Sequence, residues 1–370
     1  MARIFTLLVL LFTVSQLSAQ TLTGSFEYDG LLRDYRLYVP GAYDGSQPWP
    51  LVFNLHGYTS NAAQQELYSQ MNVVADTGHF LVCYPNGVLE SWNVSLPGGS
   101  QADDVGFINA LIDTLSAHYA IDPERVFTCG MSNGGYMSYK LACELTDRFA
   151  AIASVTGSMV PTEAAFCNPS HPIPVLEIHG TADPVVPYLG LAFSLSIPDL
   201  LDLWIGKNGC VGDPLVIPIP DINLLDASTA DLIQYNDCEE GTEVWHYKVY
   251  NGGHTWPGAP IGIGITNQDF NASSAIWEFF LRHSPAGPSA TNDADREIAE
   301  VTAFPNPFSE TLNIRLPDEE RTISVFNSLG QLMWRGSRSG DFVLNTVQWP
   351  AGIYWLQMTG YSKASSLVKE

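Results

Sequence analysis

Between residues 50 and 282 the chain alternates short apolar runs with segments in which apolar residues recur at helical spacing. The apolar runs occupy residues 50–55, 80–84, 126–129, 150–155, 175–178 and 244–250, and the helical segments occupy residues 62–77, 103–119, 134–145 and 271–282. Strands that alternate with helices form a mostly parallel sheet with helices on both faces. An α/β fold is therefore predicted, and residues 25–28 and 36–39 add two strands as a hairpin or sheet edge.

The pattern changes near residue 284. Residues 284–295 read S-P-A-G-P-S-A-T-N-D-A-D, which is a linker composition. Beyond them, short alternating runs over residues 312–316, 322–326, 332–335 and 353–358 are separated by Gly, Asn and Pro turns, which predicts a small all-β sandwich. The charge changes too, because residues 296–370 carry 7 basic and 8 acidic side chains, against 9 and 31 before them.

The first twenty residues indicate export. They read M-A-R-I-F-T-L-L-V-L-L-F-T-V-S-Q-L-S-A-Q, which is one Arg, a short apolar run and then small polar residues. This pattern predicts a secretory signal peptide that is cleaved after Ala19, and the apolar run is too short to span a bilayer. Four segments are thus predicted: a signal peptide over residues 1–19, an α/β domain over 20–284, a linker over 285–300 and a β-sandwich over 301–370.

The overall charge excludes several classes of partner. The 370 residues include 16 Lys and Arg against 39 Asp and Glu, a net charge of −23. A surface this acidic repels phosphate, so neither nucleic acid nor an anionic membrane surface is an expected partner. No stretch after the signal peptide is long and apolar enough for membrane insertion.

Six cysteines in an exported chain are candidates for disulfides, and six allow 15 pairings. Cys83 and Cys129 lie in apolar runs and equally well fit free, buried thiols. Spacing leaves the connectivity open, and we favour the local pairs Cys143–Cys167 and Cys210–Cys238. No Cys-x-x-Cys or His-x-x-x-His spacing occurs, so a structural zinc site is not expected.

Residues 130–134 read G-M-S-N-G and lie directly between an apolar run and a helical segment. G-x-S-x-G alone is a weak signal, because Gly and Ser are common, but a nucleophile elbow requires this strand–turn–helix setting. The glycines leave room for a sharp turn, and the N-terminus of a helix favours developing negative charge. Ser132 is therefore the predicted nucleophile, with an ordinary Gly/Ser turn as the alternative.

A serine nucleophile needs a base, and the base needs an orienting acid, in the chain order Ser, acid, His. Asp183 follows the apolar run 175–178, and His254 follows the run 244–250, so they are the predicted partners. His179, at a strand end, is predicted to shape its loop. Other candidates are weaker because they have no clear preceding strand, lie inside a strand, or lie beside prolines or helix ends: Asp213, Asp237, His246, His171 and His283.

The oxyanion of the reaction is expected to bind the backbone N–H groups of Asn133, which follows the nucleophile, and of Tyr58, in the loop after an early strand. His56 precedes the serine in the chain, so shaping this loop is favoured over a role as base. Trp256, Trp92 and Tyr136, together with Tyr58, are predicted to form a stacking surface for sugar or aryl groups. Ordinary packing is the alternative for each.

Five segments in order carry a family resemblance: L-H-G-Y-T-S-N-A, D-D-V-G-F-I, I-D-P-E-R-V-F-T-C-G-M-S-N-G-G-Y-M-S, H-G-T-A-D-P-V-V-P-Y and G-G-H-T-W-P-G. Over residues 33–282 the chain resembles secreted α/β-hydrolases of the polyhydroxybutyrate depolymerase and feruloyl or acetylxylan esterase group, close to carbohydrate esterase family one. The resemblance implies an α/β-hydrolase fold and a triad of Ser132, Asp183 and His254, which agrees with the choice made from the residues.

The tail has a resemblance of its own. F-P-N-P-F near its start, V-F-N-S-L-G in its middle and A-G-I-Y later resemble the C-terminal sorting domain of type IX secretion in Bacteroidetes. The resemblance implies the type IX secretion machinery as a partner and an extracellular or cell-surface location. Such domains often begin with Y-P-N-P and end on a basic residue, whereas this chain ends in Lys369-Glu370.

The predicted function is that of a secreted serine carboxylesterase. It would hydrolyse feruloyl or acetyl groups on plant cell-wall polysaccharide through an acyl-enzyme, with no metal or organic cofactor. One alternative substrate is a polyhydroxybutyrate-type polyester, because the acidic surface suits either neutral substrate. A serine peptidase on the same fold and a catalytically silent surface-binding protein are further alternatives, and the intact triad argues against the silent protein.

Overall fold

The computed structural model describes residues 19–284, 302–305, 307–316, 321–327, 332–358 and 365–369. The predicted linker, and the predicted signal peptide apart from Ala19, lie outside these residues.

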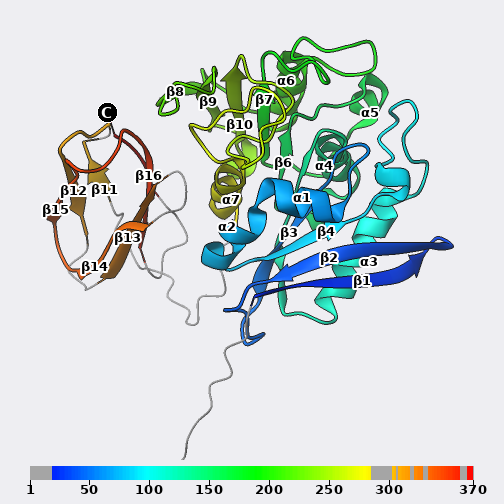
Figure 1. Cartoon of the computed structure of the whole chain (residues 1–370), viewed down its shortest axis with the longest axis horizontal. Coiled ribbons are helices and arrows are strands. Elements are labelled where there is room, and N and C mark those ends of the chain that lie inside the picture. Colours follow the sequence, from blue (N-terminus) through cyan, green and yellow to red (C-terminus); the bar gives the residue numbers. More distant parts are fainter. Residues whose placement is uncertain are drawn as a thin grey trace, which may run out of the picture.

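Residues 19–284 form one sheet with helices on both faces (Figure 1). Its ten strands have the order β1-β2-β4-β3-β5-β6-β7-β10-β9-β8. The six from β4 to β10 in this order pair in parallel, and antiparallel strands flank them on both sides. The strands are β1 (Gln20–Tyr28), β2 (Leu31–Val39), β3 (Trp49–Leu55), β4 (Leu81–Pro85), β5 (Ile121–Met131), β6 (Ala151–Val155), β7 (Val175–Gly180), β8 (Leu215–Ile219), β9 (Thr229–Tyr235) and β10 (Val244–Tyr250).

The helices divide between two core clusters, one on each face of the sheet. They are α1 (Ala62–Ser69), α2 (Met71–Gly78), α3 (Asp104–Ser116), α4 (Asn133–Glu144), α5 (Pro161–Phe166), α6 (Ile197–Lys207) and α7 (Ala272–Arg282). One cluster contains buried residues of α3, α4, α5 and α6, and the other those of α1, α2 and α7. Successive side chains of a strand point to opposite faces, and accordingly Leu51 and Phe53 of β3 lie in the first cluster and Val52 lies in the second. The predicted mostly parallel α/β sheet, with helices on both faces, is confirmed.

Two local predictions differ from the structure. The single helix predicted over residues 62–77 is two helices, because Gln70 has a left-handed backbone with φ 53°, which ends α1 and precedes α2. The sequence patterns also missed α5, α6, β8 and β9. Every second residue of β9 is buried, whereas β8 is an edge strand that is largely exposed, so neither forms the continuous apolar run of a central strand.

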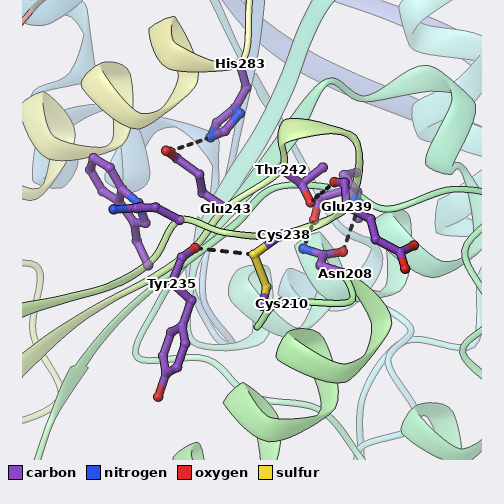
Figure 2. Close-up of a disulfide and its surroundings, with 11 residues drawn as sticks. Asn208, Cys210, Tyr235, Cys238, Glu239, Thr242, Glu243 and His283 are labelled. Atoms are coloured by element: carbon purple, nitrogen blue, oxygen red, sulfur yellow. Dashed lines mark hydrogen bonds and ion pairs between the residues drawn. A yellow bond between two sulfur atoms is a disulfide. The ribbon is translucent and has the colours of Figure 1, made fainter. Parts of the chain in front are cut away.

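Both favoured disulfides are present, and Cys83 and Cys129 are free and buried. Figure 2 shows Cys210, which follows α6, bonded to Cys238, in the segment between β9 and β10. Next to this disulfide, the Glu239 N–H donates to the Asn208 carbonyl at 2.8 Å. These bonds hold the end of α6 against the segment that leads into β10.

The tail forms two antiparallel sheets, which confirms the predicted β-sandwich. One has the order β11-β12-β15 and the other β14-β13-β16-β17. Their strands are β11 (Thr302–Phe304), β12 (Thr311–Arg315), β13 (Arg321–Asn327), β14 (Leu332–Arg338), β15 (Phe342–Asn345), β16 (Gly352–Met358) and β17 (Ser365–Lys369). Tyr354 and Leu356 of β16 belong to the core of the tail, while Ile353 and Trp355, on its other face, are buried with the cluster that contains α7.

Candidate active site

Three loops at one edge of the sheet carry the predicted nucleophile, acid and base. Ser132 follows β5, Asp183 follows β7 and His254 follows β10. These strands are parallel, so their carboxyl ends meet at the same edge, where ligands bind in open α/β sheets. The structure thus brings the three residues together, although they are separated in sequence.

Ser132 occupies a sharp turn between β5 and α4. Its backbone has φ 54° and ψ −120°, an unfavourable region for a residue with a Cβ atom. The Ser132 N–H donates to the Val155 carbonyl of β6 at 2.8 Å and holds the turn against the sheet.

The glycines on either side of Ser132 allow α4 to approach the sheet closely. A Cβ atom at Gly134 would lie 2.2 Å from the backbone oxygen of Leu55, and one at Gly130 would lie 2.5 Å from the backbone of Gly134. Larger residues at either position would push α4 away from the sheet. The G-x-S-x-G spacing therefore has a steric cause in this fold.

Asp183 and His254 form a hydrogen bond that is buried on the Asp183 side. The Nδ1 atom of His254 lies 2.7 Å from Oδ2 of Asp183, whose side chain is fully buried. The other carboxylate oxygen, Oδ1, accepts hydrogen bonds from the backbone N–H groups of Val185 and Val186 at 2.8 and 2.9 Å. Because Oδ1 is held by two donors, the carboxylate is fixed with Oδ2 directed at His254.

Ser132 and His254 line the same cleft, which has a volume of about 360 Å³. Within residues 19–284 the structure records no hydrogen bond between their side chains. Hydrogen bonds between a nucleophile and its base often tighten only when substrate is present.

Of the two amides predicted to bind an oxyanion, that of Tyr58 belongs to a residue lining the cleft, and that of Asn133 directly follows Ser132. Within the described part of the chain, neither the Tyr58 N–H nor the Asn133 N–H donates a hydrogen bond, so both are free to bind a ligand oxygen. Gly57 and Tyr58 line the cleft with Ser132. Asn133 is the first residue of α4, so its amide points out of the helix N-terminus.

His56 holds the loop that carries Tyr58. Its Nδ1 atom lies 2.7 Å from the Gly57 carbonyl, and its Nε2 atom accepts the Gly87 N–H at 2.9 Å. Burial lowers the pKa of His56 to about 4, so the ring is neutral with its proton on Nδ1. These contacts agree with the predicted loop-shaping role.

Three aromatic residues predicted to stack on substrate are instead packed in the core. Trp92 and Trp256 are fully buried, and Tyr136 is 3% exposed. Trp92 Nε1–H donates to the His56 carbonyl, Trp256 Nε1–H donates to Ser273, and the Tyr136 hydroxyl is hydrogen-bonded to Ser194. The stacking prediction for these three is therefore wrong, because their rings face the core and offer no free face. Tyr58, at 52% exposure, is the aromatic of the predicted group that lines the cleft.

The cleft wall comes largely from residues that the sequence did not single out. Its apolar lining includes exposed side chains of Leu67, Ile261 and Ile263, and its polar lining includes Ser60, Gln64 and Gln65. A second hollow of about 410 Å³ shares His254 and Ile263 with the first, so Ile263 stands between them. The alternating I-G-I-G-I of residues 261–265, just after His254, was the available signal.

Neither a metal-binding cluster nor a membrane-spanning helix occurs among the described residues. Across the described ranges there is no group of three or more His, Cys, Asp or Glu side chains that could hold a metal ion. No helix among those residues has the length and apolar character needed to cross a bilayer.

Comparison with known proteins gives two family matches. Residues 33–186 match the family described as Esterase PHB depolymerase, and residues 302–369 match the Secretion system C-terminal sorting domain. The "Putative esterase NocK" of Nocardia uniformis is 32% identical over 277 residues, which is 68% of this chain and 80% of that protein. Feruloyl esterase C of Emericella nidulans is 29% identical over 67% of this chain and 84% of that protein.

A looser likeness links the chain to solved structures. Acetyl xylan esterase from Aspergillus awamori superposes with a TM-score of 0.46 at 16% identity, over 60% of this chain and 89% of that one.

Proposed function

The chain belongs to the Esterase PHB depolymerase family, and from this premise we propose that Ser132, His254 and Asp183 hydrolyse carboxylic esters through an acyl-enzyme. The observation that carries the proposal is the 2.7 Å hydrogen bond between His254 and the buried Asp183 carboxylate. It is supported by the strained Ser132 turn on the same cleft.

In the acylation step, the Ser132 hydroxyl oxygen attacks the ester carbonyl while His254 Nε2 takes its proton. The Asp183 carboxylate holds the Nδ1–H of His254 and stabilises the imidazolium that forms. The developing oxyanion accepts hydrogen bonds from the N–H groups of Tyr58 and Asn133. His254 then returns its proton to the departing alcohol, and the acyl group stays on Ser132.

Deacylation repeats these steps with water as the nucleophile. His254 removes a proton from water, the resulting hydroxide attacks the acyl-serine, and the same amides hold the second oxyanion. Collapse of this intermediate releases the carboxylic acid and returns the proton to Ser132. No step needs a metal ion or an organic cofactor.

We propose feruloyl groups on polysaccharide as the preferred acyl groups, ahead of acetyl groups. The largely apolar cleft supports this choice, with Leu67, Ile261 and Ile263 among its walls. An aromatic acyl group buries at least 150 Å² of apolar surface, which is worth about 2–3 kcal/mol more than an acetyl methyl group. The name of the feruloyl esterase C relative points the same way.

We expect kcat/KM on a feruloyl ester to exceed that on the matched acetyl ester by at least about tenfold, from the difference in apolar burial. The Leu67→Ser variant should lose activity mainly on the feruloyl ester, because an acetyl group presents much less apolar surface to that wall. Leu225→Ser is the matched control, since Leu225 is 94% exposed and outside the cleft lining. Equal losses on both esters in Leu67→Ser would contradict the assignment.

A polyester is the second candidate substrate. Leu67, Ile261, Ile263 and Val185 are each more than half exposed around the two hollows, and an apolar solid could bind such a rim. Release of hydroxybutyrate oligomers from polymer film, with no ferulate or acetate released from xylan, would replace the feruloyl proposal. Cleavage of peptide amides with no ester turnover would instead indicate a peptidase.

The tail is a sorting domain of the type IX secretion system, and we propose that it serves export and not catalysis. A chain that ends at Ser284 should therefore fold and retain most of its kcat/KM. Its Tm should fall, because removing the tail uncovers apolar surface that Ile353 and Trp355 bury. Thermal unfolding and ester hydrolysis measured on the same preparation test both statements.

Trp355→Ser in the full chain is the matched control for this truncation. It should lower Tm in the same direction with little change in kcat/KM. Loss of hydrolysis in a folded chain that ends at Ser284 would show that the tail contributes to the active site.

A further inference from the structure

Two ionisable side chains lie directly behind Asp183 with no role in the mechanism above. Glu177 and His179 are two residues apart in β7, so both point to the same face of the sheet. Both side chains are fully buried, and His179 Nδ1 lies 2.8 Å from Glu177 Oε1. A buried charged pair is costly unless its hydrogen bonds are satisfied, so its neighbours matter.

The second nitrogen of His179 reaches the loop that carries Asp183. Its Nε2 atom lies 2.8 Å from the Val186 carbonyl oxygen and 3.5 Å from Oδ2 of Asp183. A carbonyl oxygen can only accept, so Nε2 carries a proton and donates to it.

Val186 is therefore held from both sides. Its carbonyl oxygen accepts from His179, and its N–H donates to Oδ1 of Asp183 at 2.9 Å. The Val185 N–H donates to the same oxygen at 2.8 Å. These bonds run from β7 to the carboxylate oxygen that faces away from His254, and they determine where Oδ2 points.

From these contacts we propose that His179 is a positioning residue: its buried imidazole holds the Val186 carbonyl, and thereby the turn that directs the Asp183 carboxylate at His254. The proposal rests on the proposed function, because it assumes that Asp183 and His254 act in ester hydrolysis. His179 touches neither substrate nor reacting atoms.

Glu177 keeps this arrangement electrically neutral. One proton is fixed on Nε2 of His179, and a second proton is shared between His179 Nδ1 and Glu177 Oε1. The net charge of the pair is zero whether this second proton lies on the histidine or on the glutamate. Burial lowers the pKa of His179, but Glu177 more than offsets this and leaves the pKa raised. The Tyr139 hydroxyl donates to Oε2 of Glu177 at 2.8 Å and satisfies the other carboxylate oxygen.

The negative charge of the Asp183 carboxylate, whose Oδ2 lies 3.5 Å from His179 Nε2, also raises the pKa of His179. Burial lowers the pKa of His246 to about 3, so this neighbour is neutral. The Tyr188 ring lies 6.0 Å from the His179 ring, and the Lys248 ammonium lies over the rings of Tyr188 and Tyr250. Together, His179 and Glu177 form a pair with no net charge, which donates one hydrogen bond through the Nε2–H of His179 to the Val186 carbonyl.

Two substitutions at position 179 separate its two hydrogen bonds. The amide nitrogen of Asn lies near the place of His Nδ1, so His179→Asn keeps the contact with Glu177 and loses the bond to Val186. The amide nitrogen of Gln lies near the place of Nε2, so His179→Gln keeps the bond to Val186. We expect His179→Asn to lower kcat by roughly tenfold to a hundredfold at unchanged KM, because a misplaced catalytic group costs on this scale.

His179→Gln should keep kcat within about threefold of the wild-type value, since the bond that positions the turn survives. Glu177→Gln should also keep most of kcat, although it lowers Tm by removing the partner of His179. His171→Asn is the matched control, because this half-exposed histidine contacts the Pro172 carbonyl and, at 3.5 Å, the Asp147 carboxylate, and it is outside the cleft lining. Steady-state kinetics and thermal unfolding are measured on all four variants.

The proposal holds if kcat is low only in His179→Asn, the variant that loses the bond to Val186, and does not vary with Tm across the variants. It is overturned if kcat falls alike in His179→Asn, His179→Gln and Glu177→Gln in proportion to Tm, or if folded His179→Asn has wild-type kcat. Ser132→Ala in the same assay separates the two levels of inference. Full activity of Ser132→Ala would overturn the proposed function itself, whereas its loss beside an active His179→Asn would overturn the positioning role alone.

Discussion

Replacing Ser132 by alanine is expected to lower kcat/KM for ester hydrolysis by at least about three orders of magnitude. The variant lacks the oxygen that would attack the ester, so the acyl-enzyme cannot form. Folding should be unchanged, because alanine has a Cβ atom like serine and can adopt the same backbone conformation. Its N–H can still donate to the Val155 carbonyl, as the Ser132 N–H does. Turnover of an aryl ester and labelling by a fluorophosphonate probe measure the loss.

Ser170→Ala is the control for this prediction, because the Ser170 hydroxyl bonds Asp147 on the surface, away from the cleft. It should retain activity and labelling. A folded Ser132→Ala protein with most of its activity would exclude Ser132 as the nucleophile, and absence of labelling in the wild-type protein would favour the silent surface-binding alternative.

Replacing Asp183 by asparagine is expected to lower kcat by about three to four orders of magnitude without unfolding the protein. Oδ1 accepts two backbone N–H groups, so the amide oxygen of Asn must take that place. Its NH₂ group then faces His254 Nδ1 and donates to it. His254 is forced to carry its proton on Nε2, where it cannot accept the proton of Ser132.

Asp103→Asn provides the same chemical change at a site with no expected effect on hydrolysis. Asp103 caps α3 through the Gly106 N–H, and asparagine caps helices equally well. Adding Asp183→Asn to His254→Ala should cost little more than His254→Ala alone, because triad members act as a unit. Independent, multiplying losses in this pair would show that the two residues do not work together.

The sequence determined those residues of the site that are marked by their immediate neighbours in the chain. Ser132, Asp183 and His254 each directly follow an apolar run, and runs of that kind become parallel strands whose carboxyl ends meet at one edge. Gly130 likewise reflects a contact within one strand–turn–helix unit, because its neighbour is the backbone of Gly134, whereas Gly134 is constrained by Leu55 of the adjacent strand β3. Alternation of strands and helices determined the fold class for the same reason.

Only the tertiary structure decided what surrounds that site. Trp92, Trp256 and Tyr136 lie close to the motifs in sequence, yet their rings pack into the core. Leu67, in α1, and Ile263, shortly after His254, line the cleft together although they are far apart from each other in the sequence. An apolar side chain in a loop can lie inward or outward with the same local pattern, and packing between remote segments selects one. The role of the Glu177–His179 pair was also decided by the tertiary structure. These are two polar residues in a buried strand, and no sequence pattern indicates that the folded loop brings the Val186 carbonyl to His179.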